Sequence, residues 1–247
     1  CRILSCRNAP AGLDAGAPSA TLARRNVAER LIAIGDIHGC RRALDGLLEI
    51  VAPRKDDRLV FLGDYVDRGP DSRGVLQDIL RLSESLDVVT LLGNHEEMML
   101  GVLERRSPLG WWYRYGGRET MQSYDPDCRL TSVPETHTDF LRRMRDFHEE
   151  EHHFFVHANY VASEPLESQP AEALRWADLR SGIPPLHVSG KTAIVGHTSQ
   201  KSGEVLDKGH IVCIDTFCVG GGWLTAMDLL SGKVWQADRE GRPRSAG

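Results

Sequence analysis

The chain has 247 residues, of which 41% are hydrophobic and 26% are charged, the composition of an ordinary globular protein. Thirty Lys and Arg residues against thirty-five Asp and Glu residues give a net charge of −5, which argues against a general electrostatic grip on nucleic acid. No apolar run approaches the roughly 18–20 residues that cross a bilayer, so we expect no membrane association either.

Both ends of the chain are expected to be tails. Residues 1–28 are rich in Ala, Gly and Pro and lack the apolar core of a signal peptide, so they predict a mobile tail, with a lipid-modified Cys1 as an alternative. Residues 239–247 predict a second short tail, which leaves one domain over residues 29–238. The six cysteines form no C-x-x-C pair, so we expect a cytoplasmic protein.

From residue 31 onward, apolar strand-like runs alternate with helical patterns. We expect strands over residues 31–34, 59–62 and 88–92 and helices over residues 41–52, 75–86 and 96–103. Either Asp71 or Ser72 can cap the second helix. The alternation predicts an α/β fold whose first sheet is mostly parallel.

Residues 106–137 interrupt this rhythm with four aromatic residues next to Gly116 and Gly117, and with three prolines. They predict a compact insertion or lid, with a packed surface loop as the alternative. A helix over residues 140–147 follows. The remaining strand-like runs, at 153–156, 192–195, 211–214, 223–227 and 233–236, predict a mixed or antiparallel sheet.

Polar side chains follow five of the predicted strands. In chain order they are Asp36 and His38; Asp64, Asp67 and Arg68; Asn94 and His95; His157; and His197. Because ligands of α/β sheets bind beyond the carboxyl ends of the strands, we expect these side chains to converge. Asp, His and Asn are typical ligands of a hard to borderline divalent ion, and the absence of Cys from the set argues against a structural zinc site.

The set is large enough for two metal ions, a pair that clamps phosphate oxygens in phosphoryl transfer. The six candidate ligands are Asp36, His38, Asp64, Asn94, His157 and His197. Arg68 suits a planar grip on phosphate, and His95 is left over as an acid for the leaving group.

Each of these residues also has an ordinary structural interpretation. Asp36 could lie in a turn after a strand, Asn94 with Glu97 could form a helix capping box, and Arg68 could form a surface ion pair. His157 and His197 could be hydrogen-bonded core histidines. The structural interpretations would have to be correct independently at all five strand ends. A single functional site explains all of these residues together, so it is favoured.

The five motifs GDIHG, GDYVDRG, GNHE, VHAN and GHT, in this order, resemble those of calcineurin-like metallophosphoesterases, in the branch that contains bacterial and phage serine/threonine protein phosphatases. The resemblance extends from Leu31 to about Trp235. It implies an αββα sandwich of two mixed β-sheets flanked by helices. It also implies a dinuclear metal-dependent phosphatase in which a metal-bound hydroxide attacks phosphorus directly.

The resemblance also implies a role for each matching residue. Asp36 and His38 resemble ligands of the first metal, Asp64 the bridging carboxylate, and Asn94, His157 and His197 the other ligands of the second metal. His95 resembles the catalytic acid and Asp67 its hydrogen-bond partner. Arg68, together with Asn94, is expected to contact the substrate phosphate, and Arg175 or Arg180 could supply a second phosphate arginine.

The substrate is predicted from details of the motifs. Symmetrical diadenosine-tetraphosphate hydrolases have a second motif similar to GDLVARG, with Ala where this chain has Asp67. The aspartate at this position favours a serine/threonine phosphoprotein substrate. A dinucleoside polyphosphate or a small phosphoester is the alternative, and an inactive phosphate-binding scaffold is the alternative of another class. The family often has Asp-Thr-Gly where this chain has Asp215, Thr216 and Phe217, which puts the fit of the substrate in question. Two Mn²⁺ ions fit the ligands best, with Fe or Zn as alternatives.

Overall fold

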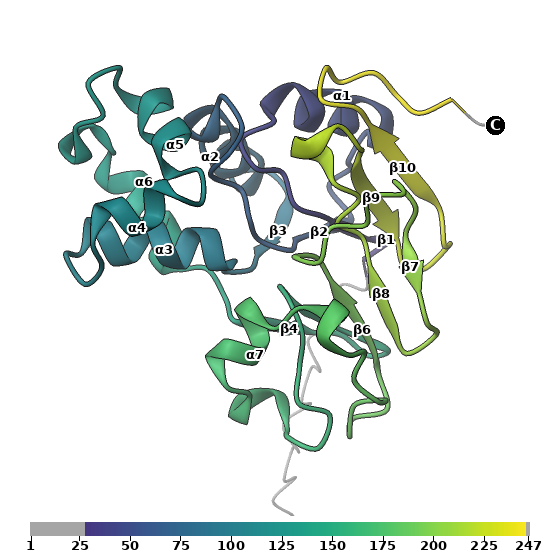
Figure 1. Cartoon of the computed structure of the whole chain (residues 1–247). Coiled ribbons are helices and arrows are strands. Elements are labelled where there is room, and N and C mark those ends of the chain that lie inside the picture. Colours follow the sequence, from purple (N-terminus) through teal and green to yellow (C-terminus); the bar gives the residue numbers. More distant parts are fainter. Residues whose placement is uncertain (1–27, 246–247) are drawn as a thin grey trace, which may run out of the picture.

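The computed structural model describes residues 28–245 and arranges them as two β-sheets that face each other, with helices on the outside (Figure 1). This is the predicted αββα sandwich of two mixed sheets. The predicted N-terminal tail over residues 1–28 lies outside the described residues except for its last residue.

Each sheet has five strands, three of which are parallel neighbours. In spatial order, the first sheet contains β10 (Val234–Ala237), β9 (Leu224–Asp228), β1 (Arg30–Ile34), β2 (Asp57–Phe61) and β3 (Asp87–Thr90). The second contains β4 (Phe147–Glu149), β5 (His153–Val156), β6 (Thr192–Val195), β8 (Ile211–Cys213) and β7 (Leu206–Asp207). In the second sheet the parallel strands are the central three, with an antiparallel strand at each edge. In the first sheet the parallel strands are β1, β2 and the edge strand β3, and the antiparallel pairings of β9 and β10 lie on the other side of β1.

The helices follow the strands on the outer faces. They are α1 (Arg41–Val51), α2 (Ser72–Ser83), α3 (Asn94–Leu103), α4 (Leu109–Tyr113), α5 (Gly117–Tyr124), α6 (Glu135–Arg142) and α7 (Ala171–Trp176). Short 3₁₀ turns add η1 (Leu130–Ser132), η2 (Leu166–Ser168), η3 (Leu179–Ser181) and η4 (Cys218–Gly220). As predicted, Asp71 caps α2 by accepting the backbone N–H of Gly74 at 2.8 Å.

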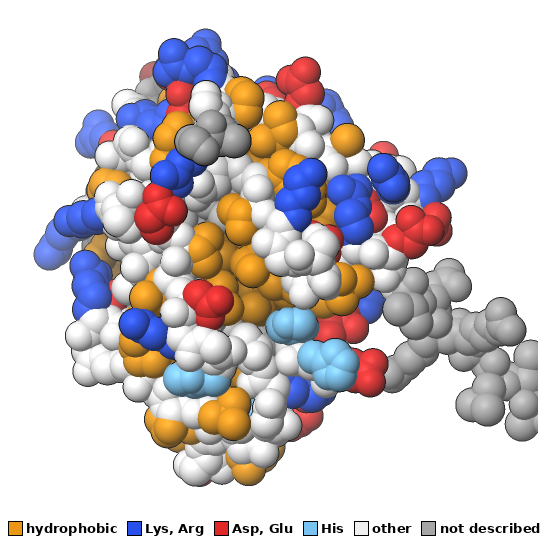
Figure 2. Space-filling model, turned by 90° about the vertical axis from the view of Figure 1, so that its right-hand side faces the viewer, with side chains coloured by type: hydrophobic (Ala, Val, Ile, Leu, Met, Phe, Trp, Pro, Cys, Tyr) orange, Lys and Arg blue, Asp and Glu red, His pale blue; other side chains and the backbone are white. Residues whose placement is uncertain are grey.

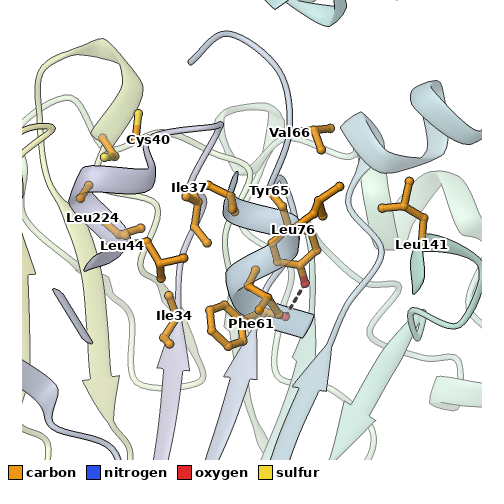
Figure 3. Packing of buried hydrophobic residues seen from close by; sticks show 14 of the residues in the cluster. Ile34, Ile37, Cys40, Leu44, Phe61, Tyr65, Val66, Leu76, Leu141 and Leu224 are labelled. Atoms are coloured by element: carbon orange, nitrogen blue, oxygen red, sulfur yellow. Dashed lines mark hydrogen bonds between the residues drawn. The ribbon is translucent and has the colours of Figure 1, made fainter. Parts of the chain in front are cut away.

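Strand β1 shows why the apolar runs are continuous. Leu31 and Ala33 face the second sheet and pack in a shared core with Phe155 and Ile194. The alternate residues of β1 face the other way, toward α1 and α2, in the larger core that Figure 3 shows from close by. A central strand covered on both faces needs apolar side chains at every position.

The predicted helix over residues 140–147 is wrong in its boundaries. Helix α6 begins after Pro134 and ends at Arg142, and Phe147 opens strand β4. The chain straightens because the N–H of Arg145 donates to the carbonyl of Thr90, and the carbonyl of Arg145 accepts from Leu92. These bonds tie the segment to the end of β3, which a single-segment pattern does not reveal.

The interruption at residues 106–137 contains α4, α5, η1 and the start of α6, packed beside α2 and α3 (Figure 1). Trp112 and Met121 from this segment are fully buried in the larger core. A role as a lid stays a prediction. Residues 239–245, within the predicted C-terminal tail, return along β10, where Pro243 pairs with Ala237 and the N–H of Arg244 donates to the carbonyl of Gln236.

The open edges of the two sheets share one face of the molecule, where Figure 2 shows hydrophobic side chains gathered together. A hollow beside β10 is lined by residues that include Val205, Val234 and Trp235. Lys233 lies 4.7 Å from the ring centre of Trp235, and such cations shield aromatic faces at a sheet edge. Among the described residues, no helix has the length and apolar character needed to span a membrane.

A buried ion pair fixes the start of the first sheet and gives a test of stability away from the strand ends. Asp57 accepts Arg30 Nε at 2.9 Å and the backbone N–H of Arg54 at 2.6 Å. Burial disfavours the charge of Asp57, but these hydrogen bonds outweigh it and lower the pKa of the carboxyl. The pair therefore stabilises the fold above about pH 4, and its contribution is lost as the pH falls through the folded pKa.

We predict that Asp57→Asn lowers the free energy of unfolding by about 1.5–3 kcal/mol at pH 7, the usual contribution of hydrogen bonds to a charged group. Because the wild-type carboxyl becomes protonated in acid, the difference between the two proteins should shrink toward pH 3. Denaturant unfolding at both pH values tests this. A difference that is the same at pH 7 and pH 3 would contradict the charged pair.

Candidate active site

The structure brings the polar residues of the five motifs to one place, where strand ends of both sheets meet. The loops after β1, β2 and β3 supply residues from the first sheet, and the loops after β5 and β6 supply residues from the second. The residues in these loops, and in the first turn of α3, are Asp36, His38, Asp64, Asp67, Arg68, Asn94, His95, His157 and His197. All of them except Arg68 and His197 are almost completely buried. Such a concentration of buried polar groups is costly unless it is compensated.

Asp64 lies at the centre of this cluster. One oxygen of its carboxylate lies 3.3 Å from His157 Nε2, and the other lies 3.4 Å from His38 Nε2 and 3.9 Å from His95 Nε2. Two groups of side chains with spacing suited to a metal ion share this carboxylate: one contains His38 and His95, the other His157 and His197. The predicted ligand Asn94 adjoins the second group, because its Oδ1 lies 3.1 Å from His157 Nε2 and 3.2 Å from His197 Nδ1.

The protonation of His157 tests whether a cation fits here. Its Nδ1 lies 2.8 Å from the carbonyl oxygen of Leu62, which can only accept, so Nδ1 carries a proton. In the neutral ring, the lone pair of Nε2 then faces an oxygen of Asp64. Two lone pairs facing each other at this distance repel, whereas a positive ion between them would bind both. The donor set therefore fits a divalent cation.

Charge and burial support the same conclusion. Burial, with the charges of Asp215 and Asp64, raises the pKa of Asp36 well above its usual value. Burial also lowers the pKa of His38 well below its ordinary value, and lowers that of His197 to about 4. Neutral imidazoles beside crowded carboxylates are what metal binding requires of these residues. Asp36 is tied to the second sheet, since it accepts the backbone N–H of His197 at 3.0 Å.

His95 is held by a carboxylate, as predicted. Its Nδ1 lies 2.6 Å from Asp67 Oδ2. Asp67 also accepts the indole N–H of Trp112 at 2.8 Å and the hydroxyl of Thr120 at 2.7 Å. Burial disfavours the charged form of His95, but the charge of Asp64 and the hydrogen bond to Asp67 outweigh this and raise its pKa. This arrangement fixes the ring with Nδ1 on Asp67 and leaves Nε2 facing Arg68 and Asp64.

Arg68 lies between the two imidazoles of the first group. Its guanidinium donates to His38 Nε2 and to His95 Nε2, each at 2.8 Å. The backbone N–H of Arg68 donates to the carbonyl of Gly116 in the helical insertion. A Cβ at Gly116 would lie 2.5 Å from the backbone nitrogen of Arg68, so this close approach requires a glycine. The insertion thus borders the arginine directly.

The backbone of the site is strained. Of the nine described non-glycine residues with positive φ, five are His38, Asp64, Asp67, Arg68 and His197. Each such conformation costs about 1–2 kcal/mol relative to ordinary backbone, and it persists where surrounding contacts impose it. Phe217 also has a positive φ, of 66°, at the position where the resembling family often has glycine.

The sequence interpretation missed one residue that organises the cluster. Glu96 is fully buried, and its two oxygens accept the backbone N–H groups of Asp64, Tyr65, Val66 and Gly93 at 2.8–3.1 Å. Four donors thus surround the two oxygens of this carboxyl, while burial and the charge of Asp64 raise its pKa to about 8. The alternative interpretation of Asn94 and Glu97 as a capping box does not hold, because the N-cap is the residue before Asn94. Gly93 is the N-cap of α3, and Glu96 is the glutamate three residues later that completes the capping box. This spacing of a glutamate after the N-cap could have indicated its role from the sequence.

We predict that Glu96→Gln weakens metal binding about 10- to 100-fold, because an amide N–H₂ would face backbone donors and displace the turn that carries Asp64. Metal-dependent activity titrated with Mn²⁺ measures the affinity. Glu97→Gln is the matched control, since Glu97 points instead to Arg175 and Trp176. Equal metal affinity in the wild type and in Glu96→Gln would contradict this role.

The two candidates for a second phosphate arginine are both engaged by carboxylates. Arg175 donates to Glu97 at 2.9 Å and to Asp146 at 2.6 Å, and it is buried. Arg180 is exposed and pairs with Asp178. The structure places neither guanidinium in hydrogen-bond contact with the predicted metal ligands, so a second phosphate arginine stays a prediction.

The sequence is similar to a known family and to named proteins of that family. The profile of the family described as "Calcineurin-like phosphoesterase" matches residues 29–214. Proteins named symmetrical bis(5'-nucleosyl)-tetraphosphatase are 32% identical over 61% of this chain in Nitrosospira multiformis and 30% identical over 83% of it in Dechloromonas aromatica. The chain spans about half of the Nitrosospira protein (51%) and 95% of the Dechloromonas protein.

Solved structures share the fold. A crystal structure described as that of a candidate diadenosine tetraphosphatase superposes with a TM-score of 0.65 at 24% identity, covering 90% of this chain and 96% of the other. A serine/threonine phosphatase of Saccharomyces cerevisiae superposes with a TM-score of 0.54 at 16% identity, covering 81% of this chain and 73% of the other. At these identities, the likeness concerns the arrangement of sheets and helices alone.

Proposed function

Because this chain belongs to the calcineurin-like phosphoesterase family, we propose that it is a metal-dependent hydrolase of dinucleoside polyphosphates that cleaves diadenosine tetraphosphate symmetrically. Water adds across the central P–O–P bridge, and each half leaves as ADP. The observation that carries the proposal is the 30% identity to a symmetrical tetraphosphatase over 95% of that protein's length. The serine/threonine phosphatase favoured by Asp67 thus becomes the second candidate.

The proposed reaction requires metal ligands, a phosphate-binding group and a proton donor. Asp36, His38, Asp64, Asn94, His157 and His197 would hold two divalent ions, which supply positive charge to phosphoryl oxygens and lower the pKa of water. Arg68, with the amide of Asn94, grips the equatorial oxygens of the phosphoryl group under attack. His95, held at Nδ1 by Asp67, delivers a proton from Nε2 to the departing oxygen.

The buried, low-dielectric position of the cluster strengthens each of these interactions. Mn²⁺ is the ion we propose, because carboxylate, amide and imidazole ligands suit it. Fe and Zn are the alternatives, and activity restored with each metal after chelation distinguishes them.

A direct comparison of substrates tests the proposal. Purified protein with Mn²⁺ is given diadenosine tetraphosphate or a phosphoserine peptide at equal concentration. We expect larger kcat/KM for diadenosine tetraphosphate, with ADP as its only nucleotide product. Faster release of phosphate from the peptide would support the protein phosphatase instead. No metal-dependent turnover of either substrate would support the inactive scaffold.

A further inference from the structure

We propose that Trp111, Tyr115 and Trp176, called here the aromatic row, form a stacking surface for one nucleobase of the substrate. This inference rests on the proposed function, because it assigns a place to the nucleoside of that substrate. The aromatic row is assigned no part in the metal and phosphate chemistry described above.

The three rings are in contact. The ring centres of Trp111 and Tyr115 lie 5.7 Å apart, and those of Trp111 and Trp176 lie 6.1 Å apart with their planes inclined by 32°. Trp111 and Trp176 are partly exposed, and Tyr115 is 40% exposed, one of the few large hydrophobic side chains with that exposure in the described chain. Part of this aromatic surface therefore remains in contact with solvent.

One end of the aromatic row adjoins the phosphate arginine. Tyr115 precedes Gly116, whose carbonyl accepts the backbone N–H of Arg68 and whose Cα approaches the Arg68 backbone too closely for a side chain. Adjacent Cα atoms lie 3.8 Å apart, so Tyr115 begins one residue from this contact.

The other end adjoins the second metal group. The indole N–H of Trp176 donates to Glu97 Oε2 at 2.6 Å. Glu97 lies three residues after Asn94 on α3, and residues at this spacing occupy the same side of a helix. Trp176 is thus anchored one helical turn beyond a predicted metal ligand, and Trp111 joins the two ends. The aromatic row borders the phosphate site along the start of α3.

This position suits a base. In a nucleoside diphosphate, one further phosphate and a ribose separate the terminal phosphorus from the base, so a base must lie beside the site and not inside it. The faces of aromatic side chains bind bases by stacking, which is sequence-tolerant and contributes strongly to affinity. The aromatic row offers such a surface, and it begins one residue from the Gly116 contact with Arg68. A phosphoserine or phosphothreonine residue, by contrast, has no planar group that could stack.

The test uses two inhibitors that share a diphosphate and differ in the nucleoside: ADP and inorganic pyrophosphate. Their inhibition constants are measured against p-nitrophenyl phosphate with Mn²⁺ for the wild type and for Tyr115→Ala, Tyr115→Phe and Tyr113→Ala. Tyr113 is the matched control, because it lies two residues from Tyr115, at the end of the helix that carries Trp111, with its ring under Arg118 and outside the aromatic row.

We expect Tyr115→Ala to raise the inhibition constant of ADP about 5- to 150-fold, the range for losing one stacked base, and to leave that of pyrophosphate unchanged. Tyr115→Phe and Tyr113→Ala should match the wild type for both inhibitors. An unchanged ADP constant in Tyr115→Ala, or an equal rise for pyrophosphate, would overturn the aromatic row as a base site. A wild type that binds ADP in this way yet does not cleave diadenosine tetraphosphate would refute the proposed function alone.

Discussion

Asp64→Ala is expected to lower the content of both metal ions and to abolish most of the phosphatase activity. The carboxylate of Asp64 belongs to both groups of side chains that could hold an ion, and it lies within 3.4 Å of a histidine from each. Its loss should cost more than the roughly 10- to 100-fold that removal of an outer partner of a ligand costs. Elemental analysis of the purified variant, together with kcat/KM on p-nitrophenyl phosphate, measures both effects.

The comparison variant is His38→Ala, which removes a side chain found in only one of the two groups. It should lose mainly one ion and retain the other. If Asp64→Ala binds two ions with the affinity of the wild type, this carboxylate does not bind both ions, and this conclusion holds whether or not activity is lost.

His95→Asn is expected to retain both ions and to lose activity according to the leaving group. The alkoxide of serine is a poor leaving group, so hydrolysis of a phosphoserine peptide should fall about 10²- to 10⁴-fold, the usual contribution of a general acid. ADP leaves through a terminal phosphate whose second pKa is about 6, and it needs a proton much less. Losses on diadenosine tetraphosphate and on p-nitrophenyl phosphate should therefore be clearly smaller.

Steady-state kinetics on the three substrates, with metal content measured in parallel, provide the result. His137→Asn is a suitable control, because His137 is a buried histidine that hydrogen-bonds to Tyr124 within the helical insertion. Equal losses on all three substrates with both ions present would mean that His95 positions the phosphate and does not donate the proton.

The central strands and the convergence of the motifs could be predicted from the sequence for a physical reason. A parallel strand buried on both faces is a continuous apolar run, and the polar residue that follows it lies at the sheet edge where ligands bind. Asp36, Asp64 and Asn94 each follow such a run. The order of motifs then identified the family.

Other features depend on contacts between distant segments. Trp112 and Thr120 hold Asp67 from 45 and 53 residues away, and no local pattern in residues 106–137 indicates this. The straight segment at Arg145 is likewise imposed by β3. The sequence interpretation of the substrate relied on a single residue, Asp67, whereas the similarity to one symmetrical tetraphosphatase over 95% of its length favours the alternative.

The divided origin of the cluster has a mechanical consequence. Asp36, Asp64 and Asn94 come from one sheet and His157 and His197 from the other, and Asp36 accepts a backbone N–H of His197 across the gap. Ions bound there would join the two sheets at one end of the sandwich, while apolar side chains pack between the sheets elsewhere. Metal binding would then stabilise the packing of one sheet against the other. A chelator that stops turnover would also weaken this packing, first at the strand ends that carry the metal ligands.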